Sequence, residues 1–339
     1  MLRGFVLLAL LLASCAQPAV VPAVETVTPR QFAGSTPSPL NTLAPTAASV
    51  LPTATGTTIS SPTLTKTATI PALPTKKAPA TADPFADFTV DALAAREYGG
   101  GILSIEETLE QNEHFARYLI SYPSDGLRIA GFMNVPHEGR QFPVAIVLHG
   151  YVPPAEYETL AYTQRYADAL AKAGYFVIHP NLRNYPPSDS GPDIFRTGMA
   201  IDVLNLIAII KEQSQDDTGP LRRAKADDLN LWGHSMGGGV ALRVVTVNND
   251  EAIRAAVLYG AMSGDERLNY SRILEWSGGR RGETELAAPQ ETLAAISPIN
   301  HLQRIKAAIS IHHSDADNVV PLAWSEDLCR RLQRIGHPG

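Results

Sequence analysis

Between residues 142 and 335 the hydrophobic pattern alternates between two kinds of segment. Short apolar runs occur at 142–148, 175–179, 229–232, 253–259 and 304–312. Runs of this length are typical of strands that are buried on both faces of a parallel sheet. Segments with helical spacing occur at 160–173, 194–213 and 322–335. The alternation predicts the α/β fold class, with a mostly parallel, doubly wound sheet and helices on both faces.

Upstream of this region the pattern predicts a hairpin and one short helix. Residues 115–122 and 127–135 resemble paired strands, and the residues between them, Pro123-Ser124-Asp125-Gly126, favour a tight turn. Ser104 and Glu107 have the spacing of a helix capping box, so we expect a short helix that runs toward Glu113.

The first fifteen residues have the composition of an export signal. Arg3 precedes an apolar run at 5–13 that is too short to span a bilayer. Residues 12–15, Leu-Ala-Ser-Cys, resemble a bacterial lipobox, in which Cys15 would carry the lipid. We therefore expect an exported protein that is lipid-anchored to the cell envelope and faces outward. The alternative is an ordinary secretory signal that is cleaved near Ala16, so that Cys15 is discarded.

Composition divides the rest of the chain into two parts. Residues 16–82 are rich in Pro, Thr, Ala and Ser, which predicts a disordered, extended spacer because such a segment buries little apolar surface. Residues 83–339 have the length of one α/β domain. The net charge is −6, and no basic run indicates a nucleic-acid partner.

The strongest candidate for chemistry is Gly233-His234-Ser235-Met236-Gly237. It has the pattern G-x-S-x-G and lies between a predicted strand and a predicted helix, which is the setting of a nucleophile elbow. The alternative is a glycine-rich turn without catalytic function. In the catalytic interpretation, Ser235 is a nucleophile whose oxyanion is stabilised by backbone N–H groups. We expect these donors to be Met236, which follows the serine, and Tyr151, in the loop after the strand at 142–148.

The acid of a catalytic triad is expected in a loop after a later strand. Two carboxylates compete there, and we prefer Asp317 to Asp315 because Asp317 directly precedes the run Asn-Val-Val-Pro at 318–321. The segment weakly resembles a calcium loop, but valines stand where later ligands belong. We therefore predict no metal site, and no cofactor is indicated.

The catalytic base has no convincing candidate in the sequence as given. His337 is the only histidine after Asp317, and it follows a predicted helix directly. A further strand and a histidine-bearing loop would normally follow that helix. We therefore expect the domain at 83–339 to be incomplete at its C-terminus, with the last strand and the triad histidine missing.

These motifs resemble the α/β-hydrolase superfamily, and more narrowly the catalytic domains of prolyl-oligopeptidase-like serine hydrolases. The resemblance lies in residues 122–131, 142–150 and 297–321, together with the elbow around Ser235. It implies that Ser235 is the nucleophile and Asp317 the triad acid. A predicted spacer precedes the domain where such peptidases carry a β-propeller. The elbow is also similar to those of cutinase-like and dienelactone-hydrolase-like esterases.

Three functions remain open at this stage. The leading hypothesis is an exported serine hydrolase that cleaves ester or short-peptide acyl bonds through an acyl-enzyme on Ser235. A dedicated carboxylesterase is the alternative among enzymes. The third hypothesis is a non-catalytic binding module on a hydrolase fold. The expected partners are a small ester or peptide substrate and, through the lipid anchor, a membrane.

Overall fold

The structure, a computed structural model, describes residues 83–248 and 250–337. The predicted export signal, the lipid-attachment residue Cys15 and the predicted spacer lie outside the described residues. Within the described residues, no helix is both long and apolar enough to span a membrane.

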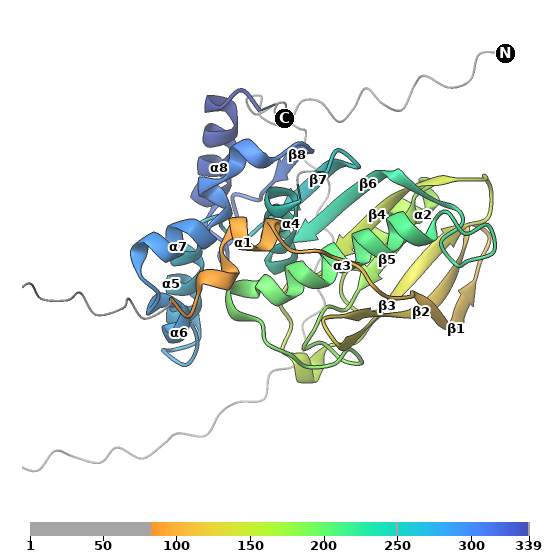
Figure 1. The fold of residues 1–339 in the computed structure, drawn as a ribbon, viewed down its shortest axis with the longest axis horizontal. Coiled ribbons are helices and arrows are strands. Elements are labelled where there is room, and N and C mark those ends of the chain that lie inside the picture. The colour runs from red at the N-terminus through yellow and green to blue at the C-terminus, as the bar shows by residue number, and fades with distance from the viewer. Residues whose placement is uncertain (1–82, 249, 338–339) are drawn as a thin grey trace, which may run out of the picture. The chain divides into compact units, whose positions relative to one another are not determined.

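One eight-stranded sheet organises the described residues, with the strand order β1-β2-β3-β5-β4-β6-β7-β8 (Figure 1). The pairs β1–β2, β2–β3 and β3–β5 are antiparallel. The remaining pairs, β5–β4, β4–β6, β6–β7 and β7–β8, are parallel. The strands are β1 (Ser104–Gln111), β2 (Phe115–Ser124), β3 (Leu127–Pro136), β4 (Phe142–Leu148), β5 (Phe176–Pro180), β6 (Ala224–His234), β7 (Ile253–Tyr259) and β8 (Ala308–His312). The predicted α/β class with a mostly parallel sheet is confirmed.

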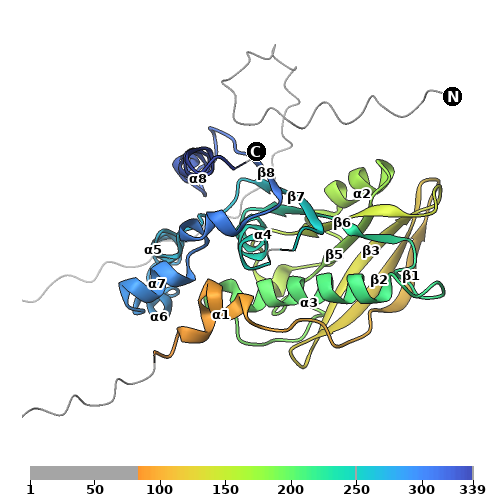
Figure 2. The same cartoon turned by 45° about the horizontal axis from the view of Figure 1, so that its top comes forward.

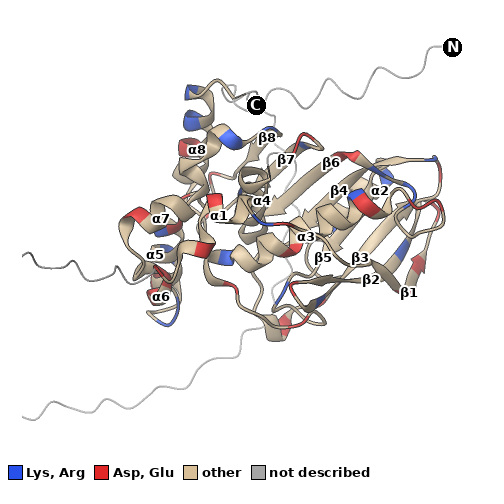
Figure 3. Ribbon diagram, viewed as in Figure 1, with Lys and Arg blue, Asp and Glu red and all other residues tan. Residues whose placement is uncertain are grey.

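Helices connect the strands and cover both faces of the sheet. They are α1 (Val90–Ala94), α2 (Gln164–Lys172), α3 (Thr197–Gln213), α4 (Met236–Val247), α5 (Glu266–Trp276), α6 (Glu283–Leu286), α7 (Gln290–Ile296) and α8 (Leu322–Arg334). Short 3-10 helices lie at Ala86–Phe88, Pro154–Glu156, Ile194–Arg196, Pro298–Asn300 and Leu302–Arg304. Acidic and basic residues both occur along these elements (Figure 3).

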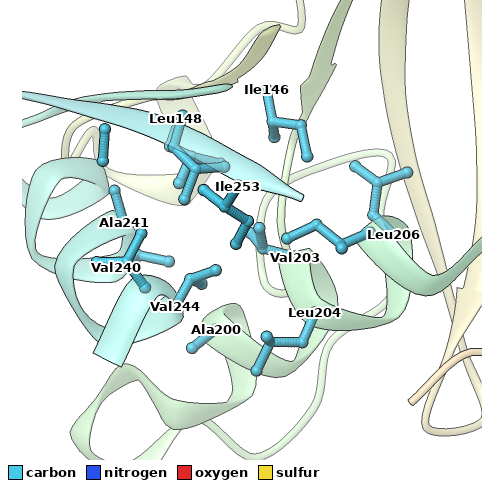
Figure 4. Close-up of a cluster of buried hydrophobic side chains, with 14 of the residues drawn as sticks. Ile146, Leu148, Ala200, Val203, Leu204, Leu206, Val240, Ala241, Val244 and Ile253 are labelled. Atoms are coloured by element: carbon cyan, nitrogen blue, oxygen red, sulfur yellow. The ribbon is translucent and has the colours of Figure 1, made fainter. Parts of the chain in front are cut away.

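Strand β4 shows why its sequence is apolar throughout. Side chains alternate between the two faces of a strand, and here both faces are covered. Ile146 and Leu148 pack into the cluster formed with α3 and α4 (Figure 4). Ala145 and Val147 pack into a second cluster, formed with α2. Figure 2 shows α2 and α3 on opposite faces of the sheet.

The predicted helix from Ser104 toward Glu113 is wrong, because these residues form the edge strand β1. The strand pairs with β2, and its Glu106 accepts a hydrogen bond from the Ser121 hydroxyl. Glu106 also lies 3.2 Å from a guanidinium nitrogen of Arg128 on β3. Contacts with the hairpin, which local spacing does not reveal, therefore outweigh the helical capping signal. The hairpin itself, predicted at 115–122 and 127–135, is confirmed as β2 and β3.

A buried ion pair fixes the long loop between β5 and α3. Asp202 on α3 is fully buried and accepts hydrogen bonds from the backbone N–H of Arg183, at 2.9 Å, and from its guanidinium, at 2.8 Å. Ser124, at the end of β2, donates a third hydrogen bond to Asp202 at 2.7 Å. Arg183 in turn donates to the carbonyl of Pro192. One carboxylate thus joins the hairpin, the loop and the helix.

Replacing Asp202 should destabilise the fold because it leaves Arg183 buried without its counter-charge. We expect Asp202→Ala to lower the free energy of unfolding by about 3–5 kcal/mol, measured by urea denaturation. The matched control is Glu326→Ala, which removes an exposed ion pair with Arg330 on α8 and should cost about 1 kcal/mol or less. Equal effects of the two substitutions would contradict the structural role of Asp202.

Candidate active site

Ser235 lies in the turn between β6 and α4 with strained backbone angles. Its φ is 52° and its ψ is −114°, a combination that non-glycine residues rarely adopt. Two hydrogen bonds hold it there. The Ser235 N–H donates to the Tyr259 carbonyl at 3.0 Å, and the Ser235 carbonyl accepts from the Met262 N–H at 3.0 Å. The end of β7 and the segment after it therefore maintain the geometry expected of a nucleophile elbow.

The glycines around Ser235 are required by close backbone packing. A Cβ atom on Gly237 would lie 2.4 Å from the Leu148 carbonyl oxygen, and one on Gly233 would lie 2.4 Å from the Gly237 carbonyl oxygen. The first turn of α4 consequently packs directly against the end of β4. The pattern of small residues on both sides of the serine has a steric cause.

This packing brings the two expected oxyanion donors to the same corner. Met236 is the first residue of α4, so its N–H has no partner within the helix. Tyr151 follows Gly150 in the turn after β4. This turn lies close to the serine, since a Cβ atom added to Gly150 would lie 3.2 Å from the Ser235 Cβ. The Tyr185 hydroxyl lies 3.7 Å from the Met236 sulfur and supports this corner from the β5–α3 loop.

His149, beside the oxyanion turn, has a structural position. It is fully buried, and its two ring nitrogens lie 2.7 Å from the carbonyl oxygens of Gly150 and Asn181. Burial lowers its pKa, which favours the neutral ring. The side chain therefore ties the turn after β4 to the end of β5.

Asp317 lies in the loop between β8 and α8, with one oxygen used by that loop. Its Oδ1 accepts hydrogen bonds from the Val319 and Val320 N–H groups, both at 2.9 Å. Its Oδ2 lies 3.4 Å from the His313 Nε2. Asp317 lines the cavity that contains Ser235, whereas Asp315 is exposed and does not. Among residues 83–248 and 250–337, no group of three His, Cys, Asp or Glu side chains is placed to hold a metal ion.

Neither His234, beside Ser235 in the chain, nor His313, in the Asp317 loop, hydrogen-bonds to the Ser235 hydroxyl. His234 lines the cavity, and its Nδ1 lies 2.7 Å from the Tyr162 hydroxyl. Burial lowers the pKa of His234, while the Asp317 charge acts in the opposite direction. His313 is directed toward Ser325 and the Val320 carbonyl. His337 does not line the cavity; its N–H donates to the Leu332 carbonyl in the cap that ends α8.

Comparison with known families identifies this arrangement. A family model described as the alpha/beta hydrolase fold matches residues 143–328. The chain belongs to the α/β-hydrolase family. The match includes β4 from its second residue onward, the elbow and the loop that carries Asp317, so the three parts of the candidate site fall within it. A search of curated proteins finds no match.

Solved structures of similar fold include both esterases and peptidases. Acetyl xylan esterase 1 from Thermoanaerobacterium is 18% identical with a TM-score of 0.53, and the match covers 73% of this chain and 83% of the esterase. The acylaminoacyl peptidase of Pyrococcus horikoshii is 20% identical with a TM-score of 0.53, over 67% of this chain and 36% of the peptidase. A puromycin-hydrolyzing peptidase of Mycobacterium tuberculosis is 18% identical with a TM-score of 0.50, over 66% and 35%. This hydrolase therefore spans about a third of the length of the two peptidases.

A cavity of about 720 Å³ opens beside the elbow of this α/β hydrolase. Its lining mixes polar and apolar residues and includes the aromatic side chains of Tyr151, Tyr162, Tyr185, Tyr270, Trp276 and Trp324. Part of the wall comes from α5 and α6, which lie with α7 in the segment between β7 and β8 (Figure 1). We refer to residues 261–299, which contain these three helices, as the lid segment.

Arginines join the lid segment to the turn after β4 and to the loop between β8 and α8. Arg281 donates to the Tyr151 hydroxyl at 2.9 Å, and its guanidinium lies 5.0 Å from the centre of the Tyr151 ring. Arg272 donates to the carbonyl oxygens of Asn318 and Val319, at 3.2 and 3.3 Å. The lid segment thus contacts the turn after β4 at Tyr151 and the loop between β8 and α8 at Asn318 and Val319.

The base of the lid segment is held by a buried charge cluster. Glu266 on α5 accepts hydrogen bonds from Arg196 and from Arg243 on α4, both at 2.5 Å. All three side chains are buried, and Arg196 lies over the Tyr270 ring with a separation of 5.0 Å. Because two guanidinium groups share one carboxylate, the cluster carries a net charge of about +1.

Asp193 is a cavity-lining carboxyl with an unusual pKa. Burial raises its pKa to about 7, although the Met199 N–H donates to its Oδ1 at 3.0 Å. Sequence patterns did not reveal Asp193, nor Arg196 and Glu285, which also line the cavity. No local pattern marks them, because each reaches the cavity only through the folding of the β5–α3 loop or the lid segment.

The raised pKa of Asp193 should make stability depend on pH. The folded protein holds this proton up to about pH 7, whereas the unfolded chain releases it near pH 4. Ionisation of Asp193 therefore opposes folding as the pH rises through this window. We expect Asp193→Asn to become progressively more stable than the wild type between pH 4 and pH 7, by at most about 1.4 kcal/mol per pH unit. Urea denaturation across this range measures the difference, and a constant difference would contradict the raised pKa.

Proposed function

We propose that the protein is a serine hydrolase that cleaves ester or short-peptide acyl bonds through an acyl-enzyme on Ser235. The observation that carries this proposal is the strained Ser235 backbone, held beside a cavity by the ends of β4 and β7. A strained serine at a glycine-packed strand–helix turn has an evident use when its hydroxyl is presented to a substrate.

In the proposed reaction the Ser235 Oγ attacks the acyl carbon and its proton passes to a base. The Met236 and Tyr151 N–H groups stabilise the negative charge that develops on the acyl oxygen. Collapse of this intermediate expels the alcohol or amine, which takes the proton, and water then hydrolyses the acyl-enzyme. We propose that Asp317 orients a histidine base through its Oδ2, since its Oδ1 is used by the loop.

The range of acyl substrates follows from the walls of the cavity. The cavity is large enough for a small ester or a short peptide, and six tyrosine and tryptophan side chains are among its lining residues. The similar structures include an esterase and a peptidase with equal TM-scores, so fold similarity does not favour either substrate. We propose a prolyl-oligopeptidase-like enzyme, with a dedicated carboxylesterase as the alternative.

A fluorophosphonate probe tests the nucleophile in the intact natural protein. The Ser235 oxygen should displace fluoride from the phosphorus, so that the probe labels Ser235 and a peptide carrying the label can be identified by mass spectrometry. Ser235→Ala should abolish labelling and lower turnover of p-nitrophenyl esters by about 10⁶-fold. The control is Ser214→Ala, at the end of α3 and away from this cavity. This variant should retain both probe labelling and ester turnover.

Labelling that survives Ser235→Ala would identify a different nucleophile. A wild-type protein that neither reacts with the probe nor turns over esters would instead favour a binding module on a hydrolase fold. One observation supports this second candidate: among the described residues, no histidine hydrogen-bonds to the Ser235 hydroxyl.

We also propose that the enzyme is exported and anchored through a lipid on Cys15. The support comes from the first fifteen residues, in which Arg3 is followed by an apolar run and then by Leu-Ala-Ser-Cys. We expect wild-type protein to sediment with membranes and Cys15→Ser to be released into soluble fractions. Metabolic labelling with a fatty acid should mark the wild type and spare the variant. A wild-type protein that is fully soluble, with a mature N-terminus beyond Cys15, would contradict the anchor.

A further inference from the structure

Two carboxyl groups line the cavity without a charged partner. Asp193 belongs to the loop between β5 and α3, and Glu285 belongs to α6 in the lid segment. Within residues 83–248 and 250–337, the Met199 N–H is the one donor to the Asp193 carboxylate, and it occupies Oδ1. The Glu285 carboxylate receives no hydrogen bond and forms no ion pair in the same part of the chain. Both acids therefore have acceptor oxygens available inside the cavity.

The two arginines whose charges act on Asp193 are paired with other acids, whereas Arg281, which also lines the cavity, donates to the Tyr151 hydroxyl. Arg183 forms its ion pair with Asp202, and Arg196 forms its ion pair with Glu266. These charges affect the Asp193 pKa, since Arg196 and Arg183 lower it and Asp202 raises it, but burial outweighs them. Neither guanidinium approaches Asp193 within ion-pair distance in the described residues. The carboxyl is thus close to positive charge and still without a direct donor on its second oxygen.

Aromatic side chains lie beside the same acids. Burial is the main cause that raises the pKa of Tyr270, and the charges of Glu285 and Asp193 raise it further. The Asp193 charge also raises the pKa of Tyr185, after the larger effect of burial. Tyr185 and Tyr270 line the same cavity as the two acids. Tyr185 in turn contacts Met236, so the acids and the elbow face one continuous cavity.

We propose that Asp193, assisted by Glu285, binds the primary ammonium group of the substrate. The preferred substrates are then acyl compounds with a free amino group, such as amino-acid esters, amino-acid amides or peptides with an unblocked N-terminus. The inference extends the proposed function, because the ammonium group belongs to the molecule whose acyl bond Ser235 attacks.

The chemistry of the pocket favours an ammonium group over other ligands. An ammonium group supplies up to three N–H donors and a positive charge, which match two unpartnered carboxylates. Aromatic surroundings add attraction between the cation and the ring faces. A neutral sugar would also donate hydrogen bonds, but it would gain little from the charge of the acids. A ligand carboxylate in this place would present acceptor oxygens to acids that themselves have acceptor oxygens without donors.

The test measures binding in the Ser235→Ala protein, so its outcome does not depend on catalysis. Isothermal titration calorimetry at pH 6 compares L-phenylalaninamide with N-acetyl-L-phenylalaninamide, which differ in the free amino group. We expect the free amine to bind about 10- to 100-fold more tightly. Adding Asp193→Asn should remove this preference and leave the affinity of the acetylated compound unchanged. The asparagine has nearly the same shape as the aspartate, and unfolding curves will show that the variant is folded.

Proton release provides a second measurement that a purely structural role would not affect. Asp193 is largely protonated at pH 6, and an ammonium group at its side favours the carboxylate. Binding of L-phenylalaninamide should therefore release up to one proton, seen as a dependence of the binding enthalpy on the ionisation enthalpy of the buffer. Asp193→Asn should abolish this dependence. Glu283→Gln, an exposed substitution on α6 outside the cavity, should preserve it.

The proposal is overturned if the two compounds bind equally, or if Asp193→Asn keeps the preference for the free amine. Tighter binding of a neutral sugar such as xylose, without proton release, would overturn it as well and indicate a polyol pocket. If Ser235 fails the fluorophosphonate test while the amine preference depends on Asp193, the proposed reaction is wrong and the amine site stands.

Discussion

The close approach of α4 to the end of β4 is the constraint on which the site depends. Gly237 packs against the carbonyl oxygens of Leu148 and His149, at distances that no Cβ would tolerate. This contact places the first turn of α4, and with it the Met236 N–H, beside the oxyanion turn. Hydrogen bonds from Ser235 to the end of β7, and from the segment after β7 back to Ser235, complete the junction. Ser235, the turn that carries Tyr151 and the loop that carries Asp317 lie on one side of the molecule because β4, β6 and β8 are parallel and end at the same edge of the sheet.

The walls of the cavity are positioned in a different way from the elbow. The β5–α3 loop contains four non-glycine residues with positive φ, namely Leu182, Asn184, Phe195 and Arg196. Such backbone is costly unless the surroundings determine it. Here Asp202 holds one end of the loop through Arg183, and Glu266 holds the other through Arg196. Buried ion pairs are expensive to desolvate, so their contribution here is better understood as fixing one loop conformation than as adding net stability.

The sequence could predict those parts of the molecule whose signals are local. Strand β4 was predictable because both of its faces are buried, and the elbow because its glycines have a steric cause within a few residues. The edge strand β1 was not, because its charged residues are explained by Ser121 and Arg128 on other strands. Asp193 and Glu285 could not be recognised either. A carboxylate in a polar segment normally indicates solvent exposure, and only the fold brings these two into one cavity.

The elbow would determine the reaction, whereas the cavity walls would determine which substrates are accepted. The atoms that would carry out acyl transfer are set by the ends of parallel strands, where small displacements are sterically forbidden. The residues that would distinguish substrates lie on a loop and a lid segment, which are joined by the Arg196–Glu266 ion pair and by an apolar cluster that contains Phe195, Tyr270 and Ile296. Asp193 lies on the loop and Glu285 on the lid segment, so a ligand that engages both must bridge the two. The Arg196–Glu266 ion pair and the contact of Arg281 with Tyr151 already hold the loop, the lid segment and the turn after β4 together, so such a ligand would meet a preformed site.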